Sequence, residues 1–126
     1  MSAGCQIGGA IVVDSARIPW YSPPGHPGAY SKILVGPGAP AESDAIDFRV
    51  SLYPPGGEVT PHVHEKAWHI YYFISGEALM LLGEEEIVAR AGQAVFIPAG
   101  VVHGAKNTST EDLHFVVLAV PPDIPR

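Results

Sequence analysis

Glycine and proline interrupt this sequence so often that long helices are excluded. Its 126 residues include 14 Gly and 13 Pro, and no stretch of a dozen residues keeps an apolar helical stripe free of these breaks. Between the breaks lie short runs rich in β-branched and aromatic side chains, of the kind that form strands. The sequence therefore predicts an all-β fold of short strands joined by tight turns, as in a sandwich or a closed barrel.

The expected strands are sparse near the N-terminus and become regular after residue 46. A chain of this length fits one domain over residues 1–126, with N-terminal strands and an irregular Pro- and Tyr-rich loop at 21–30 within 1–46, and regular strands within 47–120. The proline-rich end, 121–126, is expected to be a tail. We expect strands at Ala10–Val13, Ser31–Val35, Phe48–Tyr53, Glu58–His64, Trp68–Ser75, Ala78–Leu82, Glu85–Ala89, Ala94–Ile97, Val101–Lys106 and Leu113–Val120.

The charge of the chain argues against a nucleic-acid partner. The net charge is -6 with His neutral, and the seven Lys and Arg residues are scattered, whereas phosphate backbones require clustered cations. A small molecule is therefore the expected partner. The single cysteine, Cys5, fits a reducing compartment, and the apolar run at residues 7–13 is too short to span a bilayer. With no leader-like segment before it, we expect a soluble cytoplasmic protein and no membrane partner.

Four of the six histidines form an ordered arrangement. His62 and His64 are one residue apart, so on a strand both side chains point to the same face. His69 begins the next expected strand after a short connection, which predicts that the two strands are antiparallel neighbours. His103 follows a tight turn much later in the chain, and a closed barrel can bring it to the same point. Imidazole nitrogens gathered in this way are typical ligands of transition metals.

These histidines stand in two motifs that resemble those of the cupin superfamily. The first motif reads Gly, five residues, His-x-His, a spacer, Glu, six residues, Gly, and it matches residues 56–76 with His69 in place of the glutamate. The second motif reads Gly, five residues, Pro-x-Gly, two residues, His, three residues, Asn, and it matches residues 92–107. Because both motifs match in every spacing, the resemblance is specific for a fold and a metal site.

The resemblance implies a small single-domain cupin of the Cupin_2 type, folded as a double-stranded β-helix, or jelly-roll barrel. It also implies a homodimer and one divalent transition metal. A set of four nitrogens suits Mn, Fe, Co, Ni, Cu and Zn and disfavours Mg and Ca, and the resemblance favours Mn or Fe, with Zn, Ni, Cu and Co as alternatives. The ligands that the resemblance assigns to this metal are His62, His64, His69 and His103.

Other interpretations remain open for several residues. The four-histidine site could be vestigial, and His69 could be an acid–base histidine beside an ion that only the other three hold. Tyr71 shares the face of His69 by strand alternation. It is a candidate catalytic residue in the pocket or, alternatively, a core aromatic. His26 and His114 are interpreted as ordinary core histidines.

Three functions fit a site of this kind. The leading hypothesis, taken from the resemblance, is a dioxygenase-like oxidoreductase that acts on a small molecule bound to the metal through two oxygens. The second is a redox-neutral isomerase, lyase or cyclase that needs only the Lewis acidity of the ion. The third is a small-molecule-binding protein without turnover. Because one fold hosts many activities, the sequence names neither the substrate nor the metal.

Overall fold

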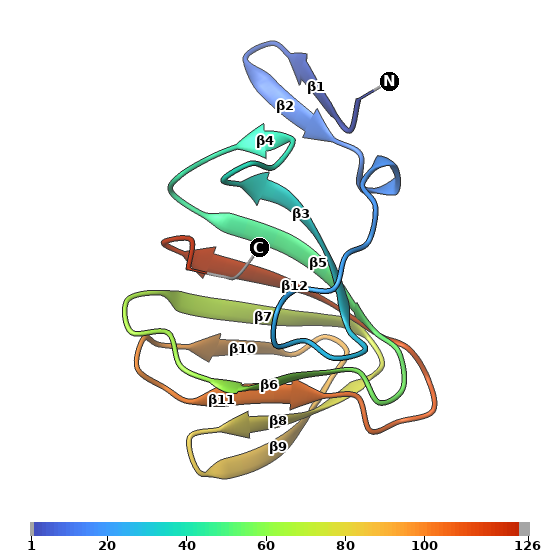
Figure 1. The fold of residues 1–126 in the computed structure, drawn as a ribbon, viewed down its shortest axis with the longest axis vertical. Helices are drawn as coiled ribbons and strands as arrows, with labels where there is room; N and C mark the ends of the chain where they lie inside the picture. Colours follow the sequence, from blue (N-terminus) through green and yellow to red (C-terminus); the bar gives the residue numbers. More distant parts are fainter. Residues whose placement is uncertain (1, 124–126) are drawn as a thin grey trace.

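The computed structural model describes residues 2–123 and is built almost entirely of strands (Figure 1). Its helical element is a three-residue 3-10 turn, Ser15–Arg17, and no helix in the described residues is long and apolar enough to cross a membrane. The strands are β1 (Gly4–Ile7), β2 (Ala10–Val13), β3 (Tyr30–Gly36), β4 (Ala41–Glu42), β5 (Asp47–Tyr53), β6 (Glu58–His62), β7 (Trp68–Ser75), β8 (Glu77–Leu82), β9 (Glu85–Arg90), β10 (Ala94–Ile97), β11 (His103–Lys106) and β12 (Leu113–Val120).

The ten strands predicted from the sequence are all present, with end shifts of one or two residues. β1 and β4 were not predicted, because Gly-Cys-Gln-Ile in β1 has a single β-branched residue and β4 has only two residues. β1 pairs only with β2 in an N-terminal hairpin, and β4 adds two residues parallel to the edge strand β3. The strand pattern of this chain is therefore readable locally wherever a strand is long enough to carry alternation.

Two facing sheets are wound together by a chain that crosses repeatedly between them. One sheet has the order β10-β7-β12-β5-β3-β4 and the other β6-β11-β8-β9. From β5 to β12 every connection passes from one sheet to the other, except the β8–β9 hairpin. This winding is the double-stranded β-helix, or jelly roll, that the sequence motifs predicted.

The prediction that β6 and β7 are antiparallel neighbours is wrong. β6 pairs with β11 in the smaller sheet, whereas β7 pairs with β12 and β10 in the larger one. The short connection between them turns a corner of the barrel instead of closing a hairpin. His69 therefore approaches the other histidines from the opposite sheet.

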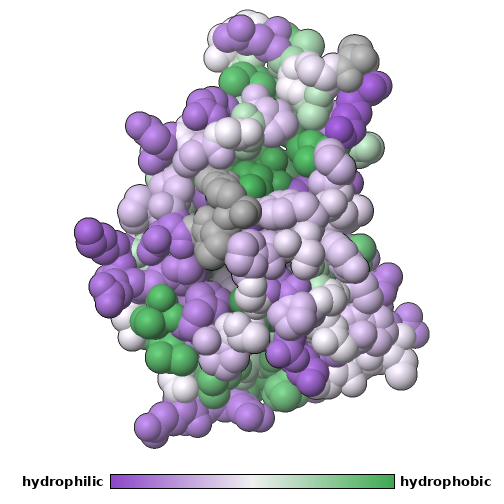
Figure 2. Space-filling view, viewed as in Figure 1, coloured by the Kyte–Doolittle hydropathy of each residue, from purple (hydrophilic) through white to green (hydrophobic). Residues whose placement is uncertain are grey.

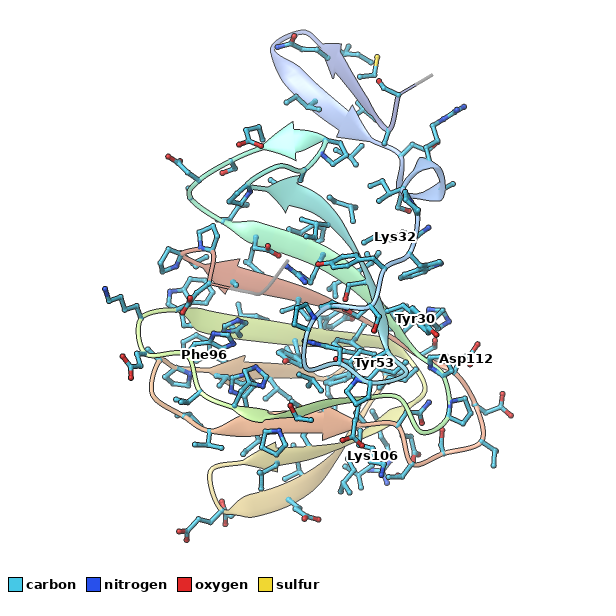
Figure 3. The ribbon with its side chains drawn as sticks, in the orientation of Figure 1. Tyr30, Lys32, Tyr53, Phe96, Lys106 and Asp112 are labelled. Atoms are coloured by element: carbon cyan, nitrogen blue, oxygen red, sulfur yellow. The ribbon has the colours of Figure 1, made fainter. Side chains whose placement is uncertain are left out.

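The larger sheet is polar on part of its inner face and apolar on its outer face. Along β5 the buried positions are Asp47, Arg49, Ser51 and Tyr53, while the apolar residues between them are half-buried on the outside. Towards the other end of the barrel the interior is filled by an aromatic and aliphatic cluster that includes Tyr53, Phe73 and Phe115 (Figure 3). The barrel thus has an apolar core at one end and a polar chamber at the other.

The segment at residues 21–30 is irregular, as predicted, and it covers the free edge of the smaller sheet. The carbonyl oxygens of Gly25 and Pro27 accept hydrogen bonds from the backbone N–H groups of Thr60 and Glu58 on β6, at 3.0 and 3.1 Å. Protecting an edge strand in this way leaves fewer unpaired backbone groups. It also places the segment beside the barrel opening, where β6 ends.

Apolar side chains also reach the surface, most of them on strands. The N-terminal hairpin exposes Ile7, Ile11 and Val12, and Figure 2 shows apolar atoms beside hydrophilic ones at the top of the view, where the hairpin lies. On the larger sheet Tyr72 and Phe96 are exposed on the neighbouring strands β7 and β10. The homodimer expected from the sequence stays a prediction.

A substitution at Gly76 would test how closely the turn between β7 and β8 packs against its neighbours. Its φ is +86°, and an added Cβ would lie 2.6 Å from the backbone oxygen of Asp112. Gly83 has a similar positive φ of +64° but open space around it. We expect Gly83→Ala to cost about 1–2 kcal/mol of unfolding free energy, from the left-handed backbone alone. Gly76→Ala should cost about 1–3 kcal/mol more because of the clash.

Urea unfolding of the two variants and the parent chain measures both costs, that of the left-handed backbone and that of the clash. Equal losses of stability would contradict the close approach of the Asp112 backbone.

Candidate metal centre

His62 and His103 face each other across two paired strands. They are direct register partners, His62 at the end of β6 and His103 at the start of β11, and their ring centroids are 4.3 Å apart. In each ring Nδ1 lies near a carbonyl oxygen two residues earlier, that of Thr60 at 2.7 Å and that of Val101 at 2.9 Å. A carbonyl only accepts, so Nδ1 carries the proton and donates. When such a ring is neutral, its Nε2 has a free lone pair.

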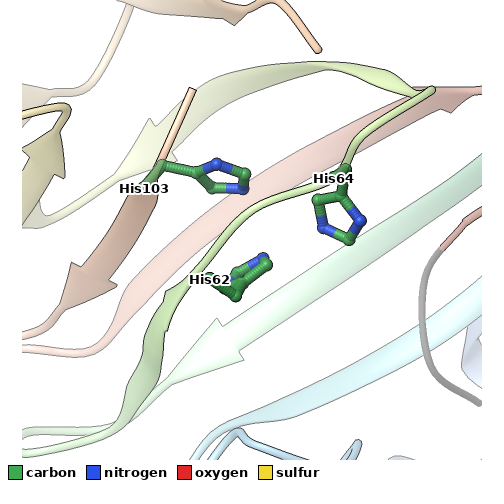
Figure 4. Close-up of side chains that lie close together, drawn as sticks. All are labelled: His62, His64 and His103. Atoms are coloured by element: carbon green, nitrogen blue, oxygen red, sulfur yellow. The ribbon is translucent and has the colours of Figure 1, made fainter. Parts of the chain in front are cut away.

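The sequence analysis placed His64 on the same strand as His62, but β6 ends at His62. Strand alternation therefore does not explain where the side chain of His64 lies. Its carbonyl oxygen accepts a hydrogen bond from the N–H of Gly100 at 2.8 Å, which ties this segment to the turn before β11. Its ring still meets those of His62 and His103, at centroid distances of 4.8 and 5.5 Å. The donor nitrogens of these three histidines lie within 4.8 Å of one another (Figure 4).

His69 completes the cluster from the opposite sheet. Its ring lies 4.2 Å from that of His64 and 5.6 Å from that of His103, measured between centroids. The side chain is 2% exposed. Its nitrogens are not among those that meet within 4.8 Å. The structure thus brings all four predicted histidines together and sets His69 slightly apart from the other three.

The buried imidazoles have nitrogen atoms without protein partners. Among the described residues, both nitrogens of His69 and Nε2 of His103 are buried without a hydrogen bond. Burial, reinforced by the neighbouring histidines, lowers the pKa of His69 to about 3, and burial lowers the pKa of His103 to about 4. Both rings are therefore neutral near pH 7. Neutral imidazole nitrogens without a protein partner can coordinate a transition metal, so these residues fit such an ion.

An opening in front of the histidines connects the cluster to solvent. A cavity of about 670 Å³ is lined by His62 and His64 together with His26 and Asp123. Behind it lies a second cavity of only about 30 Å³, which shares the three histidines of this lining and reaches inward to His69, Arg49 and Tyr71. A ligand of moderate size fits the outer cavity, whereas the inner one admits a group the size of one water molecule.

Tyr71, the predicted catalytic residue, lies on the inner face of β7 and lines the small inner cavity. Its ring centroid is 6.2 Å from that of His103, and it stacks on Phe115 at 5.4 Å. Burial raises its pKa above the usual range of a phenol, so the hydroxyl stays protonated. Tyr71 is thus both a core aromatic and a hydroxyl donor near the histidines. A catalytic role stays a prediction.

The two histidines interpreted as core residues lie elsewhere. His114 is exposed on the outer face of β12, beside an irregularity in the pairing with β7. His26 is half-buried in the loop over β6, where its Nδ1 donates to the carbonyl oxygen of Pro24 at 2.8 Å and the ring lines the outer cavity. The core interpretation was wrong for both, because neither lies on the inner face of a strand.

Sequence reasoning also missed the charged residues near the site. Nδ1 of His64 lies 3.5 Å from Oδ2 of Asp123, in a segment expected to be a tail; the rest of that tail, 124–126, lies outside the described residues. Arg49 and Asp47 form a buried ion pair behind the histidines. Their alternating positions in β5 were a readable signal, since they would have placed two charges on the inner face of a strand.

Comparison with known proteins agrees with the fold described above. The family model described as "Cupin domain" matches residues 49–120. A relative from Thermotoga maritima described as an oxalate-binding protein is 33% identical over 67 residues, 53% of this chain and 55% of that protein. The matches to curated relatives span a little over half of those proteins' lengths.

Solved structures share the architecture over more of the chain. A protein described as a predicted oxalate decarboxylase from Thermotoga maritima has a TM-score of 0.76 and 29% identity, covering 88% of this chain and 99% of its own. KdgF from a Halomonas species has a TM-score of 0.70 and 25% identity, covering 83% and 87% of the two chains.

The unpartnered nitrogens of His69 give a testable stability effect. In metal-free protein, His69→Leu should raise the unfolding free energy by about 1–3 kcal/mol, because an apolar side chain of similar size removes two buried, unsatisfied polar atoms. His62→Leu is the matched control, since His62 is half-exposed and its Nδ1 is hydrogen-bonded. Urea unfolding in the presence of a chelator measures both, and a destabilised His69→Leu protein would show that the ring has partners after all.

Proposed function

This chain belongs to the cupin domain family, and on that basis we propose that it is a metal-dependent cupin that binds a small anion through two oxygens. The observation that carries the proposal is that donor nitrogens of His62, His64 and His103 lie within 4.8 Å of one another. His62 and His64 line an open cavity, and Nε2 of His103 is buried without a hydrogen bond. Burying such groups without a partner is costly. A bound transition metal removes that cost.

The residues proposed to hold the ion are His62, His64 and His103, with His69 as the fourth donor. The Nδ1 hydrogen bonds of His62 and His103 to backbone carbonyls orient both rings and keep Nε2 free for coordination, which is how metal-binding histidines are commonly supported. Such an ion supplies Lewis acidity and, if it is Mn or Fe, redox chemistry. Mn or Fe is favoured from the sequence, and the donor set equally suits Zn, Ni, Cu and Co.

The charge of the site supports an anionic ligand. An imidazole that coordinates a metal carries no charge, so the four proposed donors would not balance the positive charge of a divalent ion. The carboxylates that line the outer cavity are the exposed Glu65 and Asp123, together with the cation of Lys66, and Asp123 lies 3.5 Å from His64. A chelating dianion would balance the charge, and the relative described as oxalate-binding supports a small dicarboxylate or a related oxygen chelator.

Turnover by dioxygen, as predicted from the sequence, remains part of this proposal, and a redox-neutral reaction competes with it. In either case the chain's own residues bind and orient the ligand in the outer cavity. Tyr71 offers a protonated hydroxyl behind the histidines. Binding without turnover is the third alternative.

Removal of one donor should abolish the effect of metal on stability. For the parent chain, an ion at a hundredfold excess over its dissociation constant should add about 2.7 kcal/mol to the unfolding free energy. We expect His103→Ala to lose most of this gain and His114→Ala, an exposed histidine, to keep it. Melting curves with added Co²⁺ and with chelator measure the difference, and equal gains in both variants would contradict the assignment.

Exchange of the ion separates the two reaction classes. If turnover consumes dioxygen, the Fe or Mn form should be active and the Zn form inactive, because Zn has no redox chemistry. A redox-neutral reaction should proceed in the Zn form without oxygen. An oxygen-electrode screen of dicarboxylates, catechols, β-diketones and enols with the three metal forms makes the comparison, and anaerobic turnover by the Zn form would refute the dioxygenase.

A further inference from the structure

Two cross-strand rows place charged and polar groups behind the histidines. Val117 on β12 is the register partner of both Arg49 on β5 and Tyr71 on β7. One row further along, Ala119 is the partner of both Asp47 and His69. Neighbouring strands are about 4.8 Å apart, so only a small side chain separates the members of each row.

Hydrogen bonds to Asp47 and Tyr21 hold the guanidinium of Arg49 in place and leave some of its N–H donors unused. Its Nε and Nη2 donate to the two carboxylate oxygens of Asp47, each at 2.9 Å, and Nη1 donates to the Tyr21 hydroxyl at 3.1 Å. A guanidinium has five N–H donors. Two therefore remain beyond the hydrogen bonds that Arg49 makes to the described residues, although the side chain is buried.

The space beside these donors is small and polar. The inner cavity of about 30 Å³ is lined by Arg49, Tyr71 and His69, and also by the hydroxyl-bearing Ser31 and Ser51. It borders the outer cavity, because both cavities are lined by His62 and His64. A single oxygen-bearing group of a ligand fits there, while the rest of the ligand occupies the outer cavity.

A purely structural ion pair accounts poorly for this arrangement. Replacing a buried ion pair with apolar residues is often neutral or stabilising, so stability alone gives little reason to keep one. Asp47 does, however, balance the charge of Arg49 when no ligand is present. The pair therefore keeps a rigid, directional donor ready inside a chamber that an anion can reach.

From this geometry we propose that Arg49 is a specificity-determining residue. It binds an outer oxygen of a metal-chelating carboxylate, with the Tyr71 hydroxyl as a second donor. The inference rests on the proposed function and narrows its ligand to di- or oxo-carboxylates, which have an anionic oxygen beyond the two that chelate. A chelator with a methyl group in that position gains nothing from Arg49.

Two chelators and a charge-balanced variant test the inference. Oxalate and acetohydroxamate both chelate through two oxygens, but only oxalate has further carboxylate oxygens. The variant Asp47→Asn/Arg49→Gln removes both charges together and so avoids an unpaired buried carboxylate. Titrations of the Co²⁺-loaded protein, followed by the visible absorption of the metal, should show oxalate affinity falling by about 10- to 100-fold. Acetohydroxamate affinity and Co²⁺ affinity should be unchanged.

Two further variants keep the test decisive. Arg49→Lys retains the cation beside Asp47 without the planar fork, and it should also weaken oxalate selectively if the double variant fails to fold. Tyr21→Phe removes only the contact to the loop, and it should leave oxalate binding intact. A loss in Tyr21→Phe equal to that in the Arg49 variants would show that Arg49 acts through the loop, which overturns the proposal.

The remaining outcomes separate this inference from the proposed function. If the Arg49 variants weaken both chelators equally, or neither, the assignment of Arg49 is wrong while the metal site stands. If the parent protein binds Co²⁺ but neither chelator, the proposed ligand class fails and the inference fails with it. If it binds no Co²⁺, the metal site itself is refuted.

Discussion

Buried polar groups need partners, and this requirement organises the functional half of the barrel. Asp47 and Arg49 satisfy each other, Ser31 and Ser51 share a hydrogen bond, and the Nδ1 atoms of His62 and His103 reach backbone carbonyls. Among the described residues, the buried side-chain nitrogens left without a hydrogen bond are both of those in His69 and Nε2 of His103, and the two rings lie 5.6 Å apart between centroids. Unpaired buried polar groups of this kind are costly, and that cost is the basis of the proposed metal site.

Several residues of the two motifs form hydrogen bonds that hold the histidine-bearing strands together. The backbone N–H of Gly56 donates to the carbonyl oxygen of Asn107, and the N–H of Asn107 donates to that of Gly57. The Asn107 side chain is fully buried and bonds the carbonyl oxygens of Tyr53 and Glu111. The end of the second motif is thereby fastened to the start of the first. These hydrogen bonds hold β6 and β11 together, and these two strands carry His62 and His103.

The inverted polarity of β5 links the chemistry to the architecture. A strand in an antiparallel sheet usually turns its apolar side chains inward, but β5 buries Asp47, Arg49 and Ser51 and turns apolar residues outward. The outward side chains join the apolar outer face of the larger sheet, and the inward ones form the chamber behind the histidines. The same alternation thus gives β5 a polar inner face and an apolar outer face.

The sequence by itself determined the strands, the turns and the identity of the histidine cluster. These are local properties: glycine and proline end strands wherever they occur, and motif spacing fixes which histidines a family barrel presents. The tertiary structure alone decided from which sheet each ligand comes. It also revealed that Arg49 lies behind the cluster and that Asp123 approaches His64. Such relations depend on pairing between strands far apart in the chain, and no local pattern encodes whether a short connection closes a hairpin or turns a corner between two sheets.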